Sequence, residues 1–167
     1  MNEKGMYFVK KSIFDLIKNV GGTWNDLKER PVLCCVESKE IKGLYWAIPV
    51  GNYNHRDNKA RERINKYISL PENNIASCYY HIGNTDVKSI FFISDVIPIT
   101  DDFLEREYIG KYSRKHYVIK NDKLNKEIER KLFRILAYES SKPNFFRQHI
   151  SDVKQVLIEK LLNMNKK

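Results

Sequence analysis

A chain of 167 residues with 42% hydrophobic residues is long enough for one domain with a sizeable core and too short for two. Seven glycines and five prolines are too few for a low-complexity protein, and no apolar run approaches the roughly 20 residues of a membrane span. The net charge of +9 makes nucleic acids the first expected partners, because Lys and Arg release counterions when they neutralise phosphates. We expect a single domain over residues 1–167, no membrane partner and a cytoplasmic location, since the N-terminus lacks the apolar stretch of a signal peptide.

The first half of the chain predicts strands and two short helices. Short apolar runs predict strands over residues 6–9, 32–36 and 44–50. The turn Lys42-Gly43 joins the last two of these strands into a hairpin. Ser12 is a candidate N-cap for a helix that ends at Gly21-Gly22. Residues 57–68 predict a second helix, with an apolar stripe on one side and a basic surface on the other.

The second half adds more strands and then two helices. Further strands are predicted over residues 77–82, 89–93 and 96–99. In the last third, about residues 121–165, apolar residues recur at helical spacing from Leu124 to Leu136 and from Val153 to Met164. Pro143 separates the two helices. Strands with helices around them predict the α+β class, with a mostly antiparallel sheet.

The strand that ends at Val50 breaks abruptly at Gly51, and the segment after it is strongly basic. From Asn54 to Tyr67 five cations stand against two anions, with His55 beside them. Cations and flat rings suit single-stranded RNA, where phosphates need charge and splayed bases need stacking surfaces. The candidate RNA contacts are Gly51, Tyr53, Lys59, Arg61, Arg63, Lys66 and Tyr67.

A second basic segment lies between Lys111 and Arg134, where nine cations meet only three anions. The excess of positive charge is therefore local. We predict a second RNA-binding surface made by Lys111, Arg114, Lys115, Arg130 and Arg134. The alternative for both segments is a solvated surface that is basic without a partner.

The cysteines and carboxylates predict neither a metal site nor a cofactor. Cys34, Cys35 and Cys78 are odd in number and lie in apolar strand-like runs, which is typical of buried reduced thiols. Neighbours in a strand face opposite sides, so Cys34 and Cys35 do not easily reach one metal. The carboxylates between residues 101 and 107 could suggest a two-metal nuclease, but helix capping and a charged face explain them better.

Several blocks of the sequence, in their order and spacing, resemble a known family. The blocks are Arg30-Pro31, Gly43-Leu44-Tyr45-Trp46-Ala47-Ile48-Pro49, His81-Ile82, Phe91-Phe92-Ile93-Ser94-Asp95, Pro98-Ile99-Thr100 and Glu105-Arg106-Glu107-Tyr108. Over about residues 6–136 the chain resembles the RNA-inhibited toxins of type III toxin-antitoxin systems. The branch that it resembles most is CptN, which is related to ToxN and AbiQ.

The resemblance implies a twisted antiparallel sheet partly wrapped by helices, similar to the MazF and Kid toxin fold. It also implies a metal-independent endoribonuclease that cleaves cellular RNA, leaves a 2',3'-cyclic phosphate and serves in phage resistance. A small pseudoknotted antitoxin RNA, which the toxin itself processes from a repeated precursor, would hold the enzyme inactive in a closed protein-RNA assembly.

The family's active site gathers a basic residue near the first core strand, hydroxyl residues after the Pro-ended second strand, and a further cation. Here Arg30 flanks Pro31, and Asn52 stands where a hydroxyl is expected; its amide donates hydrogen bonds but cannot take a proton. Metal-free cleavage needs an acid, a base and donors for the phosphorane. Histidine suits the first two roles and arginine can hold phosphate by two parallel hydrogen bonds. The catalytic candidates are Arg30, Asn52, His55, Arg56 and His81.

Two other functions compete with the RNA-inhibited nuclease. The first is a non-catalytic RNA-binding module, which the missing hydroxyls at Gly51-Asn52 favour. The second is a MazF-type RNase toxin that a protein antitoxin neutralises. Incubation with RNA in EDTA separates the nuclease from the binding module, and the DNA upstream of the coding sequence separates the two kinds of antitoxin.

Overall fold

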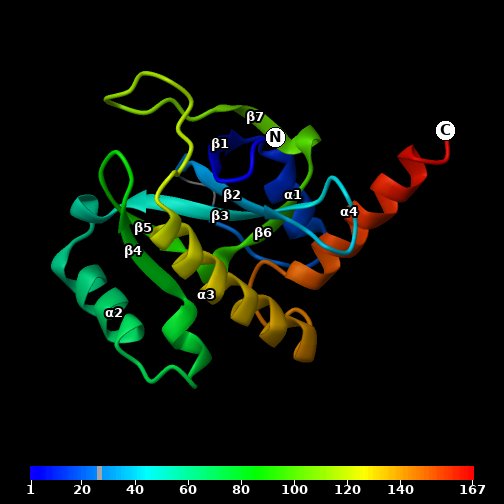
Figure 1. Ribbon diagram of the computed structural model, residues 1–167. Coiled ribbons are helices and arrows are strands. Elements are labelled where there is room, and N and C mark those ends of the chain that lie inside the picture. Colours follow the sequence, from blue (N-terminus) through cyan, green and yellow to red (C-terminus); the bar gives the residue numbers. More distant parts are fainter. Residues whose placement is uncertain (26–27) are drawn as a thin grey trace.

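The computed structural model describes residues 1–25 and 28–167, and these form an α+β fold (Figure 1). Seven strands are present: β1 (Gly5–Val9), β2 (Val32–Glu37), β3 (Tyr45–Asn52), β4 (Tyr80–Asn84), β5 (Lys88–Phe92), β6 (Ile97–Ile99) and β7 (Leu104–Glu107). The α-helices are α1 (Ser12–Asn19), α2 (Asn58–Ile68), α3 (Asp122–Ser141) and α4 (Ile150–Met164). The strands make one antiparallel sheet in the order β4-β5-β3-β2-β1-β7, and β6 pairs with β3. The α+β class with an antiparallel sheet is therefore confirmed.

Most predicted elements are present, and three local expectations are wrong. Ser12 is the first residue of α1 rather than its N-cap, a position that Lys11 takes without a side-chain hydrogen bond. The strand predicted from Ser77 begins at Tyr80, because Ile75–Cys78 forms a 3₁₀ helix whose first turn is capped by Asn74. Asp101, expected to cap a helix, is the first residue of the 3₁₀ helix Asp101–Phe103. Leu104–Glu107 then forms β7 at an edge of the sheet, where its three charged side chains discourage further strand pairing.

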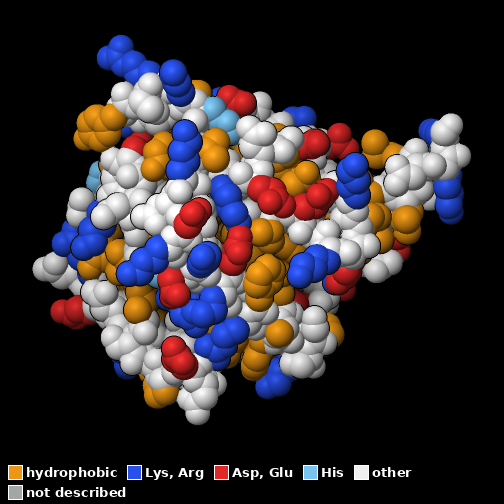
Figure 2. Space-filling model, in the orientation of Figure 1, with side chains coloured by type: hydrophobic (Ala, Val, Ile, Leu, Met, Phe, Trp, Pro, Cys, Tyr) orange, Lys and Arg blue, Asp and Glu red, His pale blue; other side chains and the backbone are white. Residues whose placement is uncertain are grey.

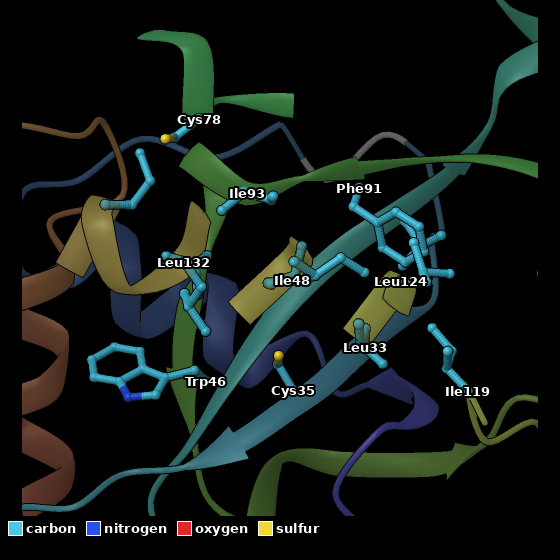
Figure 3. Close-up of a cluster of buried hydrophobic side chains, with 14 of the residues drawn as sticks. Leu33, Cys35, Trp46, Ile48, Cys78, Phe91, Ile93, Ile119, Leu124 and Leu132 are labelled. Atoms are coloured by element: carbon cyan, nitrogen blue, oxygen red, sulfur yellow. The ribbon is translucent and has the colours of Figure 1, made fainter. Parts of the chain in front are cut away.

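The helices pack on both faces of the sheet, as the alternation of side chains along β3 explains. Trp46, Ile48 and Val50 point to the face covered by α3, whose apolar stripe completes a core with Phe91 and Leu33 (Figure 3). On the other face, α1 and α4 cover a second core, and α2 packs over β4 and β5 around a small third cluster. The sheet therefore separates α3 from α1 and α2, whereas α4 begins against α3 at Ile150 and continues over the second core.

The neighbouring cysteines of β2 face opposite sides of the sheet, as predicted. Cys34 belongs to the core under α1 and α4, and Cys35 to the core under α3. Both thiols are free and buried, as is Cys78. Burial raises the pKa of both β2 thiols well above the ordinary value, to about 11 for Cys35. Among the described residues, no helix combines the length and the apolar character that crossing a membrane requires.

Candidate nucleic-acid interface

The end of β3 brings two of the catalytic candidates against one aromatic ring. The guanidinium carbon of Arg30 lies 5.1 Å from the centroid of Phe92, and that of Arg56 lies 5.4 Å from the same centroid. Gly51 makes room for this arrangement, because a Cβ atom there would lie 2.7 Å from a terminal nitrogen of Arg56 and 3.0 Å from Phe92. The space above Gly51 is thus filled by Arg56 and Phe92 rather than left open for an RNA backbone.

The two arginines share this ring without an acidic partner. Burial and, next, the charge of Arg56 lower the pKa of Arg30. Asp95 is near, but Arg147 engages both of its oxygens, at 3.3 and 3.2 Å. Among the described residues, no ion pair joins Arg30 or Arg56 to a carboxylate, and the Nε of Arg56 is buried without a hydrogen-bond partner. The site therefore holds uncompensated positive charge, which an anionic ligand would neutralise.

A groove of about 310 Å³ opens at the end of β3, and neither Arg30 nor Arg56 lines it. Asn52 and His55 both line it, together with Pro31 and Gly51. The side-chain oxygen of Asn52 accepts a hydrogen bond from the backbone N of Asn54 (2.9 Å), so its amide NH₂ is the part of this side chain that can serve a ligand. His55 ends the short 3₁₀ helix Tyr53–His55 and is exposed. Gly51, Asn52 and His55 thus come together, with Arg30 and Arg56 behind Gly51.

The opposite wall of the groove carries residues that the sequence reasoning missed. The hairpin of β4 and β5 contributes Thr85, Asp86 and Ser89. Tyr108, the residue that follows β7, also lines the groove. The hairpin arrives there because Asn52 pairs with Ser89 in the antiparallel register of β3 and β5. In the sequence, this part of the groove is visible only as a polar turn. The strand register that brings the turn next to β3 joins residues far apart in the chain and is not visible locally.

The basic face of α2 has a depression lined by four of the predicted RNA contacts. They are Lys59, Arg63, Lys66 and Tyr67. Glu62 and Leu70 complete the lining, and the depression has a volume of about 410 Å³. The ring of Tyr67 also lies near those of Tyr79 and Tyr80, at 5.7 and 5.9 Å between centroids. Three cations beside an aromatic ring fit the predicted contact with single-stranded RNA, which stays a prediction.

Tyr53 and Arg61 have structural contacts of their own. Arg61 donates to the backbone oxygen of Asn54 (3.0 Å) and stands over the ring of Tyr53, while Lys88 covers that ring at 4.3 Å. The hydroxyl of Tyr53 accepts a hydrogen bond from Asn65 (3.2 Å). These contacts hold the segment before His55 in place, so both side chains support the turn in addition to any contact with RNA.

His81 lies away from the groove, under α3. Burial first, and then the nearby cations Lys131 and Arg130, lower its pKa to about 4. Lys131 is itself buried and donates to the backbone oxygen of Tyr80 (2.9 Å). A histidine with this pKa is neutral near pH 7, and it does not line the groove with His55. The structure does not bring His81 together with the other catalytic candidates.

The second basic segment is divided between two places. Lys111 lines the groove, and Arg114 and Lys115 belong to the same loop, in which Arg114 has a positive φ of 55°. Arg130 and Arg134 lie on α3, where Arg130 pairs with Glu127 at 3.1 Å. Figure 2 shows cations mixed with carboxylates over α3 rather than an unbroken basic patch. The five predicted residues therefore come from two elements, the loop before α3 and α3 itself, and their contact with RNA stays a prediction.

The sequence matches no protein-family model, and no curated protein matches it. In the part of the chain that the structure describes, no three His, Cys, Asp or Glu side chains gather as a metal site would require.

Proposed function

We propose that this protein is a metal-independent endoribonuclease toxin of a type III toxin-antitoxin system. The observation that carries the proposal is the pair Arg30 and Arg56, which share the ring of Phe92 without a carboxylate partner. The pair lies behind Gly51, and Gly51 lines the groove that contains His55. Like charges are held together at a cost unless a ligand supplies the opposite charge, and arginine can hold a phosphate by two parallel hydrogen bonds.

The proposed site contains the groups that RNA cleavage by transesterification needs. The arginines neutralise the charge of the phosphorane, the amide of Asn52 donates to a phosphate oxygen, and His55 exchanges a proton with the reacting oxygens. The cationic depression on α2 would bind the neighbouring nucleotides through phosphate contacts and stacking on Tyr67. We further propose that the sheet is related to that of the MazF and Kid toxins, and that a small pseudoknotted RNA closes the groove in a protein-RNA assembly.

The test incubates the purified protein with single-stranded RNA in EDTA and analyses the ends of the fragments. Discrete fragments ending in a 2',3'-cyclic phosphate, lost in His55→Ala and Arg56→Ala variants that melt like wild type, support the proposal. Cleavage that disappears in EDTA and returns with magnesium contradicts the mechanism. Bound but intact RNA indicates the non-catalytic binding module instead.

The antitoxin is tested separately from the chemistry. Tandem short non-coding repeats upstream of the coding sequence, ending at a terminator, support an RNA antitoxin, and their transcript should suppress both cleavage and growth inhibition. A small open reading frame in that place, whose product suppresses toxicity, indicates a MazF-type toxin with a protein antitoxin.

A further inference from the structure

One carboxylate, Asp86, lies in the groove with His55 and Asn52. It belongs to the turn between β4 and β5, and the sheet register carries this turn to the end of β3: Asn52 pairs with Ser89, which in turn pairs with Gly83. The groove thus has a histidine contributed from the β3 side and a carboxylate contributed from the hairpin side.

Asp86 is held by three donors that leave one of its oxygens accessible to a further partner. Its Oδ2 accepts hydrogen bonds from the hydroxyl of Tyr108 (3.0 Å) and from the backbone N of Lys111 (2.9 Å). Its Oδ1 lies 3.1 Å from the hydroxyl of Thr85, which also has Ser89 Oγ at 2.8 Å as an alternative partner. A hydroxyl has one proton to donate, so Thr85 can turn to Ser89 and leave Oδ1 to a ligand.

We propose that Asp86 is the general base of the RNA cleavage and that Tyr108 and the backbone of Lys111 position its carboxylate. This inference rests on the proposed function and names a group for the reaction beyond those that the resemblance implies. It also accounts for the absence of hydroxyl residues at Gly51-Asn52, because the proton acceptor comes from the neighbouring hairpin.

In the proposed reaction, Asp86 on the hairpin side of the groove accepts one proton, and His55 on the β3 side donates another. Oδ1 of Asp86 takes the proton of the ribose 2'-hydroxyl while the 2'-oxygen forms a bond to phosphorus. The bond from phosphorus to the 5'-oxygen breaks, and protonated His55 gives its proton to that leaving oxygen. The products are a 2',3'-cyclic phosphate and a 5'-hydroxyl, and exchange of protons with water restores both side chains.

The phenol of Tyr108 is suited to positioning rather than to proton transfer. Burial, followed by its hydrogen bond to Asp86, raises the pKa of Tyr108 to about 12, so the hydroxyl remains a donor at neutral pH. Its ring is fixed against Phe8 and Tyr117, with centroids 5.8 and 6.5 Å away. A donor on a fixed ring sets the direction of the carboxylate.

The test measures kcat and KM for a pool of end-labelled, single-stranded RNA oligonucleotides of random sequence, in EDTA. Asp86→Asn should lower kcat about 100-fold or more with little change in KM, because loss of a base slows only the chemical step. Asp86→Glu should recover part of the loss. Tyr108→Phe should lower kcat about 10-fold with little change in KM, since the carboxylate loses the donor that positions it.

Asp102→Asn and Tyr112→Phe serve as matched controls, because both side chains are exposed and lie outside the groove. They should cleave at the wild-type rate. Wild-type kcat in Asp86→Asn, with His55→Ala inactive, overturns the base assignment and leaves the proposed function standing. Wild-type protein that binds RNA without cleaving it overturns the proposed function itself. If Asp86→Asn has a lower melting temperature than wild type, Tyr108→Phe is the deciding variant, since it removes one hydroxyl and keeps the carboxylate. An unchanged kcat in Tyr108→Phe then overturns the inference.

Discussion

Arg30 and Arg56 place their guanidinium groups over the same aromatic ring, although they approach it from segments on either side of the β2–β3 hairpin. Neither has a carboxylate partner among the described residues, and the adjacent Asp95 is occupied by Arg147. We propose that this relationship forms a position for an anion, which no single segment of the sequence contains. It also predicts opposite effects of substitution on stability and on activity.

Alanine at either arginine should lower kcat/KM for RNA about 100 to 1,000-fold, because each supplies charge to the transition state. The melting temperature should stay the same or rise, since one member of a like-charged pair is removed. The losses should not multiply in the double variant, because the two groups act on one phosphate. Lys160→Ala, which removes a cation over the ring of Phe103 in the core under α1 and α4, is the control. A clear fall in melting temperature for Arg56→Ala would assign it a structural role.

A methyl group at Gly51 should act through Arg56. Its position lies 2.7 Å from the end of that flexible side chain and 3.0 Å from the ring of Phe92, so the guanidinium has to move. Gly51→Ala should therefore fold, lose about 10-fold or more in kcat/KM, and add little loss to an Arg56→Ala background. Kinetics of the single and double variants measure this coupling. Independent, multiplying losses would show that Gly51 acts on the RNA directly.

His81 should make the protein acid-sensitive. Its pKa is about 4 in the folded protein against an ordinary value of 6.5, so the unfolded chain binds the proton first as the pH falls. Stability should decline between about pH 6.5 and 4, by about 1–2 kcal/mol after solvent screening of this half-buried group. The free energy of unfolding, measured by denaturant titration at both ends of this pH range, should differ less between the two pH values in His81→Gln than in wild type. The exposed His55→Gln is the control, and equal pH dependence in all three proteins contradicts the prediction.

The two arginines of α3 should contribute unequally to binding of the antitoxin RNA. Arg130 is paired with Glu127, whereas Arg134 lines a depression with Asn74 and Tyr138. Arg134→Ala should flatten the log-log salt dependence of RNA affinity by about 0.7, the value for one phosphate of a single strand, and Arg130→Ala by less. Cleavage of a short substrate should change little in either variant. Equal flattening by both variants would show that the pair with Glu127 opens on binding.

Much of the fold could be predicted because it is set by residues near one another in the sequence. The helical spacing from Leu124 to Leu136 identified α3, and the hairpin of β2 and β3 followed from two apolar runs around Gly43. The opposite directions of Cys34 and Cys35 followed from the two-residue period of a strand. The basic segments were also visible as composition alone.

The candidate site could be predicted only in part, because its members meet through the sheet register and through burial. The sequence by itself placed Asn52, His55 and Arg56 at the end of a strand, since neighbours along the chain stay neighbours in space. Only the tertiary structure shows that Asp86 and Tyr108 line the same groove, and that His81 lies outside it, beside α3. Strand pairing joins distant segments, and desolvation depends on everything that packs around a group, so neither is contained in a local pattern of residues.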